Sequence, residues 1–168
     1  MIGPALNLIL SFLVALILHE FGHWIAARFC SVPVTAVGLG WGPKLCSQTV
    51  GNINWQLRIL PFGAFVRMDM GALQKRPFPQ QLFVLSAGVL MNLILCALTW
   101  RSTFALLNLA LAIGNLLPLY QHDGWKSCLI VSRWVLGKQN SVVEWSITVI
   151  GGVMGVVLLA GAFMSDML

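Results

Sequence analysis

The sequence contains few charged residues. Only five of its 168 residues are acidic and 9% are charged, whereas 58% are hydrophobic. Soluble globular domains carry about 25% charged residues, so this composition excludes an ordinary soluble protein. The net charge is +5, but the basic residues are spread along the chain instead of forming the cluster that a nucleic-acid-binding surface needs. The composition therefore predicts a protein that crosses a membrane several times.

Paired cysteine motifs and a basic N-terminal segment are also missing. The cysteines show no CxxC spacing, so we interpret them as small apolar residues and not as disulfide partners or zinc ligands; they are Cys30, Cys46, Cys96 and Cys128. No Lys or Arg precedes Arg28, so the first apolar segment lacks the basic region of a cleaved signal peptide. We expect this segment to remain attached to the chain.

Four apolar runs each approach the ~20 residues that cross the hydrocarbon core of a bilayer. They predict one polytopic domain, 1–168, built as a membrane all-α bundle; its spans are 4–29, 82–100, 102–119 and 142–164. Nine of the ten basic residues lie at the end of the first span, between the first and second spans, or between the third and fourth spans. The positive-inside rule places these connections in the cytoplasm and both termini on the opposite side.

The segment between the first two spans, residues 33–68, has a different character. Apolar and polar residues alternate with period two after Val50-Gly51-Asn52, which predicts a strand that follows a tight turn. We therefore expect a small membrane-associated β-sheet, with one exposed edge that a substrate peptide can join as an extra strand. The predicted strand pairs are 45–50 with 53–60 and 34–39 with 62–68.

The most informative motif, His19-Glu20-Phe21-Gly22-His23, lies inside the first apolar run. Two histidines spaced i and i+4 share one face of a helix, where both can bind one zinc ion, and Glu20 is offset so that it can act on a water molecule. Ionisable groups inside a bilayer cost about 2.5–3.5 kcal/mol each on insertion scales. A bound cation offsets that cost, whereas in a soluble helix the same motif can be a solvated surface.

A catalytic zinc site needs a third protein ligand, and Asp123 is the candidate among the few acidic residues. Pro118 breaks a helix and Gly124 permits a tight turn, so the third span should unwind where the carboxylate must turn toward a metal. The alternative is an ordinary span end with an Asp-Gly turn. Two amides, Asn92 and Asn115, also lie in apolar runs, either as interhelical hydrogen-bonding groups or as donors to a substrate carbonyl or oxyanion.

Together these motifs resemble the site-2 protease family of intramembrane zinc metalloproteases (peptidase family M50), and especially its bacterial branch. The resemblance covers most of the chain. The resemblance rests first on the histidine motif and the stretch that follows it. Three further elements occur in the family's order. Residues 60–68 look like the family's β-segment, Gly88 to Asn92 match GxxxN, and Asn115 to Gly124 match NxxPxxxxDG.

The resemblance implies a zinc-dependent endopeptidase that cuts peptide bonds in or near transmembrane helices, in regulated intramembrane proteolysis or in the clearance of signal-peptide remnants. Its substrate would be a single-span membrane protein or a membrane-embedded peptide. It would reside in the bacterial inner membrane, with the active site toward the cytoplasm. The implied site holds one Zn²⁺ per chain on His19, His23 and Asp123, with Glu20 activating a water molecule and with Asn92 and Asn115 supporting substrate or transition state.

The chain departs from the family pattern in two places. Tyr120 and His122 stand where Pro and Leu are common, so His122 could contact the metal ligands, compete for the metal or donate a proton. The PDZ insertion of many bacterial members is missing, which predicts a compact member that acts on trimmed or short segments. Two other classes stay open: a catalytically silent zinc-containing binding or chaperone module, and a metal transporter, although no relay of sites across the bilayer is evident.

Overall fold

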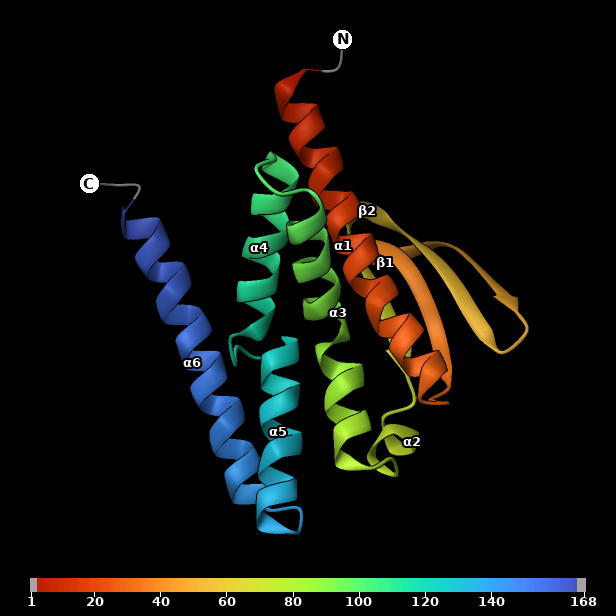
Figure 1. The fold of residues 1–168 in the computed structure, drawn as a ribbon, viewed down its shortest axis with the longest axis vertical. Helices are drawn as coiled ribbons and strands as arrows, with labels where there is room; N and C mark the ends of the chain where they lie inside the picture. Colours follow the sequence, from red (N-terminus) through yellow and green to blue (C-terminus); the bar gives the residue numbers. More distant parts are fainter. Residues whose placement is uncertain (1–2, 166–168) are drawn as a thin grey trace. The chain divides into compact units, whose positions relative to one another are not determined.

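The structure is a computed structural model that describes residues 3–165; residues 1–2 and 166–168 of the predicted domain 1–168 lie outside the described residues. The described chain divides into two compact units, Met1–Ile113 and Gly114–Leu168. The first unit contains α1, a β-hairpin, α2, α3 and α4 up to Ile113, and the second contains the end of α4, α5 and α6 (Figure 1). Each unit is described below by itself.

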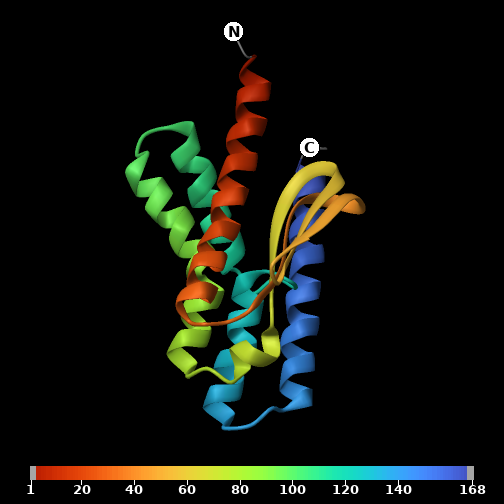
Figure 2. The same ribbon diagram turned by 90° about the vertical axis from the view of Figure 1, so that its right-hand side faces the viewer.

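The first unit is organised around α1, Pro4–Phe29, which matches the first predicted span. Proline in its first turn costs no hydrogen bond, because that N–H has no partner inside a helix. α1 packs on α3, Phe78–Leu98, and the two helices approach closely at Gly22, where an added Cβ would lie 2.7 Å from the carbonyl oxygen of Ala87. α1 therefore lies between α3 on one side and the hairpin on the other (Figures 1 and 2).

The hairpin consists of β1, Val34–Val50, and β2, Ile53–Met68, joined by a turn in which Gly51 has a φ of 62°. Val50 pairs with Ile53 and Val34 pairs with Met68, so both predicted strand pairs are confirmed within one long antiparallel hairpin. The first part of β1 has partners on both sides, since Val37 pairs with both Val66 and Trp55. The hairpin thus curls on itself, and its Ala64–Met68 segment faces α1.

Short helices complete the first unit. α2, Met70–Gln74, begins at Asp69, whose carboxylate accepts hydrogen bonds from the N–H groups of Gly71 and Ala72 and so caps the helix. α2 connects the hairpin directly to α3. After α3, the chain reverses and enters α4, Thr103–Leu116.

In the second unit, six residues separate α4 from α5, Asp123–Leu136. α5 ends at Gly137, which adopts the left-handed conformation common after helix C-termini. α6, Ser141–Ser165, follows and is joined to α5 by two hydrogen bonds from Arg133 to Glu144. An added Cβ on Gly151 of α6 would lie 2.5 Å from the carbonyl oxygen of Pro118, so this glycine permits close packing on the preceding loop.

Three helices are long and apolar enough to cross a membrane: Pro4–Phe29, Phe78–Leu98 and Ser141–Ala162. The predicted third span, 102–119, corresponds to α4, which has only 14 residues. It ends before Pro118, where the sequence predicts the break. The apolar run is therefore longer than the helix that it forms. The sequence did not predict α5, because Lys126 and Arg133 interrupt its apolar pattern.

Candidate metal centre and adjoining cavity

The two histidines of α1 are buried against α3, with exposed fractions of 4% for His19 and 5% for His23. Their ring centroids lie 5.0 Å apart with the planes at 78°. An added Cβ on Gly88 of α3 would lie 2.5 Å from Nε2 of both rings. Both Nε2 atoms therefore border one small space above Gly88, and this space exists because residue 88 has no side chain.

Groups of α3 hold the other nitrogen of each ring. Nδ1 of His23 lies 2.8 Å from the carbonyl oxygen of Val84, and Nδ1 of His19 lies 3.1 Å from Nδ2 of Asn92, whose side chain is fully buried. Histidines that bind a metal through Nε2 are oriented in this way, by a hydrogen bond at Nδ1. The donor chemistry, the burial and the space above Gly88 fit a zinc ion bound by both rings.

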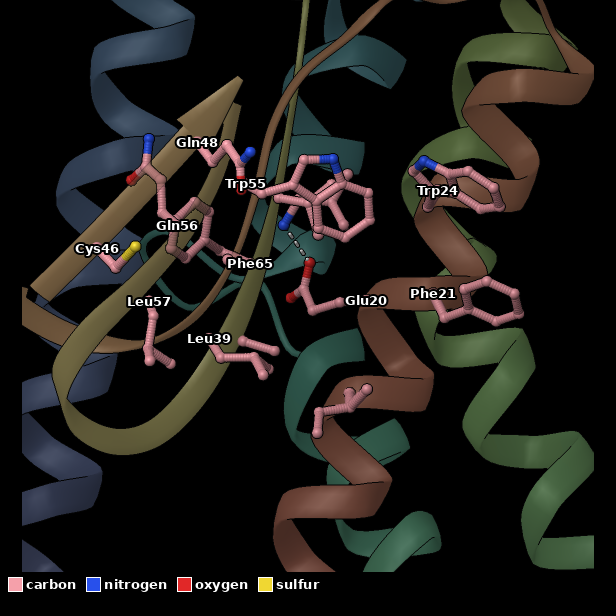
Figure 3. A pocket seen from close by; sticks show the side chains of 15 residues that line it. Glu20, Phe21, Trp24, Leu39, Cys46, Gln48, Trp55, Gln56, Leu57 and Phe65 are labelled. Carbon is pink, nitrogen blue, oxygen red and sulfur yellow. Dashed lines mark hydrogen bonds between the residues drawn. The ribbon is translucent and has the colours of Figure 1, made fainter. Parts of the chain in front are cut away.

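Glu20 projects from a different face of α1. Its carboxylate accepts a 2.8 Å hydrogen bond from the main-chain N–H of Val66 in β2. Figure 3 shows the side chain pointing from α1 toward the hairpin, near Trp55 and Phe65. Glu20 is therefore offset from the histidine face, and a strand N–H contacts its carboxylate; its action on a water molecule stays a prediction.

Glu20 lines a cavity of about 510 Å³ between α1 and the hairpin. Its walls are mostly apolar and aromatic, and its polar side chains besides Glu20 are Gln48 and Gln56 (Figure 3). The thiol of Cys46 also lines it. A carboxylate beside an apolar cavity is a common arrangement in substrate-binding sites, because the apolar walls bury the ligand and a few polar groups fix its orientation.

The remaining predicted site residues belong to the second unit. Asp123 is the first residue of α5; it is 5% exposed, and Oδ1 accepts a 3.0 Å hydrogen bond from Nζ of Lys126. His122 precedes it, and its Nδ1 lies 2.8 Å from the carbonyl oxygen of Gly114. Asn115 is half-buried near the end of α4. The unwound segment that the sequence predicts before Asp123 is confirmed.

Three contributors to the site were not identified from the sequence. Val84 and Val66 act through main-chain groups, which no side-chain motif reveals. Gly88 belongs to the GxxxN element, but that pattern alone does not say that the missing side chain leaves space for two histidine rings. The signal available was its spacing of four residues from Asn92, which places both on one face of α3.

Comparison with known proteins agrees with this geometry. A model described as peptidase family M50 matches residues 7–103. Similar proteins include "Putative zinc metalloprotease CPE1693" of Clostridium perfringens, 34% identical over 120 residues that make up 64% of this chain and 36% of the relative. "Membrane metalloprotease ARASP, chloroplastic" of Arabidopsis thaliana is 31% identical over 91 residues, 47% of this chain and 20% of the relative. The chain thus spans only a minor part of these relatives.

Proposed function

The chain belongs to peptidase family M50, a family of zinc metalloproteases, and we propose on this basis that it is a zinc-dependent endopeptidase that cuts peptide bonds in or near transmembrane helices. The observation that carries the proposal is on α1. Two buried histidines share a space above Gly88, and Glu20 projects beside them into an apolar cavity. α1 thus carries the two proposed histidine ligands and the proposed base, and it forms one wall of the cavity.

The proposed metal site holds one Zn²⁺ through His19, His23 and Asp123. A carboxylate is a suitable third ligand for a catalytic zinc that has two histidine ligands. Asp123 supports this role by its burial and by its position at an unwound segment. Lys126 engages Oδ1 of Asp123, which favours coordination through the other carboxylate oxygen. We further propose that Asn115 and His122 lie around the reacting groups, as the resemblance implies.

The proposed reaction is hydrolysis with Glu20 as the base. A zinc ion bound at the histidines supplies Lewis-acid polarisation of the scissile carbonyl and acidifies the attacking water. The Glu20 carboxylate accepts a proton from that water and then donates it to the leaving amine. The Val66 N–H donates a hydrogen bond to this carboxylate and so restricts its orientation.

The proposed substrate is a single-span membrane protein or a membrane-embedded peptide. Carbonyls inside a helix are already hydrogen-bonded, so the segment must unwind before it is cut. The cavity then accepts apolar side chains of the extended segment, and the edge of the hairpin offers main-chain partners. Substrates with Gly, Pro or Asn near the cut site should therefore react faster than one with a uniform polyleucine helix.

The long apolar helices make this a membrane protein. We propose that it forms one domain in a bacterial inner membrane, with the site toward the cytoplasm and both termini on the opposite side. In this arrangement α4 makes the third crossing together with the unwound segment that follows it. The product pathway, signalling or clearance of signal-peptide remnants, depends on the substrate.

Glu20→Gln in the purified chain tests the proposal, with tagged single-span substrates and with zinc content measured in both proteins. Removal of a general base lowers a rate by about 10²–10⁴-fold. We expect zinc retention together with loss of cleavage. If both proteins bind zinc and substrate and cut at equal rates, Glu20 is not the base. If neither cuts any substrate, the alternative of a zinc-containing binding or chaperone module is favoured.

A further inference from the structure

Asn92 has an unusual environment for a buried amide. Its side chain is fully buried, and Nδ2 lies 3.1 Å from Nδ1 of His19. Its Oδ1 is buried too and has no hydrogen-bond partner among residues 3–165. A buried polar atom without a partner costs about 1–3 kcal/mol. Asn92 therefore has one amide atom in contact with His19 and one without a partner, and the contact with a histidine is what sets it apart.

His23 shows what a metal-binding ring requires. Its Nδ1 lies 2.8 Å from the carbonyl oxygen of Val84. A carbonyl can only accept, so Nδ1 carries the proton and the lone pair is on Nε2. Nε2 is the atom that borders the space above Gly88. The main chain of α3 thus fixes His23 in the tautomer that binds a metal.

His19 needs the same tautomer to bind the same ion through Nε2, and its Nδ1 then carries a proton and requires an acceptor. The amide nitrogen that faces it here is a donor. A half-turn of the amide about its last side-chain bond exchanges nitrogen for oxygen within the same volume. Oδ1 then accepts from Nδ1–H of His19, and Nδ2 takes the place that Oδ1 has in the present structure.

We propose that Asn92 is a positioning residue for His19, and that Oδ1 of its amide accepts the Nδ1–H of the ring when zinc is bound. The inference rests on the zinc site proposed above. It differs from the role that the family resemblance implies, in which the Asn92 amide supports the substrate or the transition state. The two roles require opposite chemistry, since positioning His19 needs an acceptor and binding a substrate oxygen needs an N–H donor.

Asn108 provides a matched control. It is also fully buried and its Oδ1 also lacks a partner in the described part of the chain, but its Nδ2 donates to the carbonyl oxygen of Phe104 in its own helix. It therefore has the burial of Asn92 without the contact to a histidine. Replacing either residue by Ala removes one buried amide, and only one of the two changes should affect zinc.

The test measures the zinc dissociation constant of the purified full chain by competition with a chelator. We expect Asn92→Ala to weaken zinc binding by about 10–100-fold, as is usual for a group that orients a ligand. Asn92→Asp supplies a carboxylate acceptor at the same place, so zinc binding should remain within about threefold of wild type. Asn108→Ala should bind zinc as wild type does. Circular dichroism checks the fold of each variant.

Cleavage assays on the same proteins separate the two roles. Asn92→Asp has no N–H donor, so a substrate-binding role alone predicts that Asn92→Ala binds zinc as wild type does while both variants lose kcat, and this result would overturn the proposal. Unchanged zinc binding in folded Asn92→Ala would also overturn it while leaving the zinc site intact. If Asn92→Ala does not fold, the Asn92→Asp result decides. If the wild-type chain binds no zinc, the proposed zinc site is wrong, and this inference is wrong with it.

Discussion

α1 has two sides with different neighbours, and the two sides differ in how they hold a functional group. On the side of α3, His19 and His23 are buried and face a space that a single methyl group would fill. On the side of the hairpin, Glu20 contacts one strand N–H and lines an open cavity. The side of α1 that faces α3 is closely packed, whereas the side that faces the hairpin borders a cavity.

This difference follows from the period of the helix. Residues one position apart point about 100° apart, so a motif of five residues reaches two neighbours at once. Metal binding should therefore depend on α3, and proton transfer and substrate binding should depend on β2. Changes on the two sides should have separable effects on zinc affinity and on turnover.

The largest effect should come from Gly88→Ala on the side of α3. The new methyl group would lie where both Nε2 atoms converge, so the rings must move apart. We expect zinc affinity to fall by about 100-fold or more, the upper end of the range for groups that surround a metal ligand, with loss of cleavage. Chelator competition measures this. Gly152→Ala, whose added Cβ would meet nothing within 4 Å, is the control.

If Gly88→Ala binds zinc as tightly as wild type does, the space above residue 88 has no part in metal binding, and the proposed difference between the two sides of α1 is wrong.

Val66→Pro probes the side of the hairpin. Proline removes the N–H that contacts Glu20, and it is tolerated at a sheet edge because that N–H makes no ladder bond. Hydrogen bonds to charged groups contribute about 1.5–3 kcal/mol, so kcat should fall by about 10–100-fold. Zinc affinity should not change. Val66→Ala keeps the N–H and should cleave at nearly the wild-type rate; a loss of zinc in Val66→Pro would contradict the separation of the two sides.

The sequence predicted those parts of the fold that depend on local pattern. The bounds of α1 follow from an uninterrupted apolar run after Pro4, and the hairpin register follows from alternation around Gly51. The 14-residue α4 and the unpredicted α5 show the limit of this reasoning. An apolar run does not reveal where a helix ends inside it, and Pro118 locates the break without giving its extent.

For the candidate site, the sequence predicted which side chains share a helix face, and the roles of these side chains in metal binding and catalysis stay predictions. The spacing of His19 and His23 specifies a shared helix face, and the structure places both rings against α3. The groups that orient the site were not predictable in the same way. The carbonyl of Val84 and the N–H of Val66 exist at every residue, so only the three-dimensional fold selects them.

Cysteine labelling compares the cavity with the buried end of α1. The expected difference in labelling rate is smaller than the effects of Gly88→Ala and Val66→Pro. Cys46 is exposed and lines the cavity, whereas Cys30 is buried, and burial raises the pKa of its thiol. A raised pKa leaves less thiolate at neutral pH, so in single-cysteine variants Cys46 should react with a maleimide at least about tenfold faster. A bound substrate peptide should slow the reaction of Cys46 alone. Equal protection of both thiols would show that the peptide does not occupy this cavity.

The smallest effect should come from the second unit, where Arg133 donates 2.7 Å and 3.0 Å hydrogen bonds to Glu144. The hydrogen bond to Glu144 raises the pKa of Arg133, so the guanidinium stays charged and contributes no pH dependence near neutrality; its contribution would be lost only as pH rises through that raised pKa. Because the side chains are partly exposed, Glu144→Gln should lower stability by about 1 kcal/mol, measured as a shift of the thermal midpoint. Zinc affinity should stay at the wild-type value, since neither residue is a proposed metal ligand or a group that orients one. A stability loss accompanied by zinc loss would mean that metal binding depends on the packing of α5 on α6, and the two sides of α1 would then not be its sole determinants.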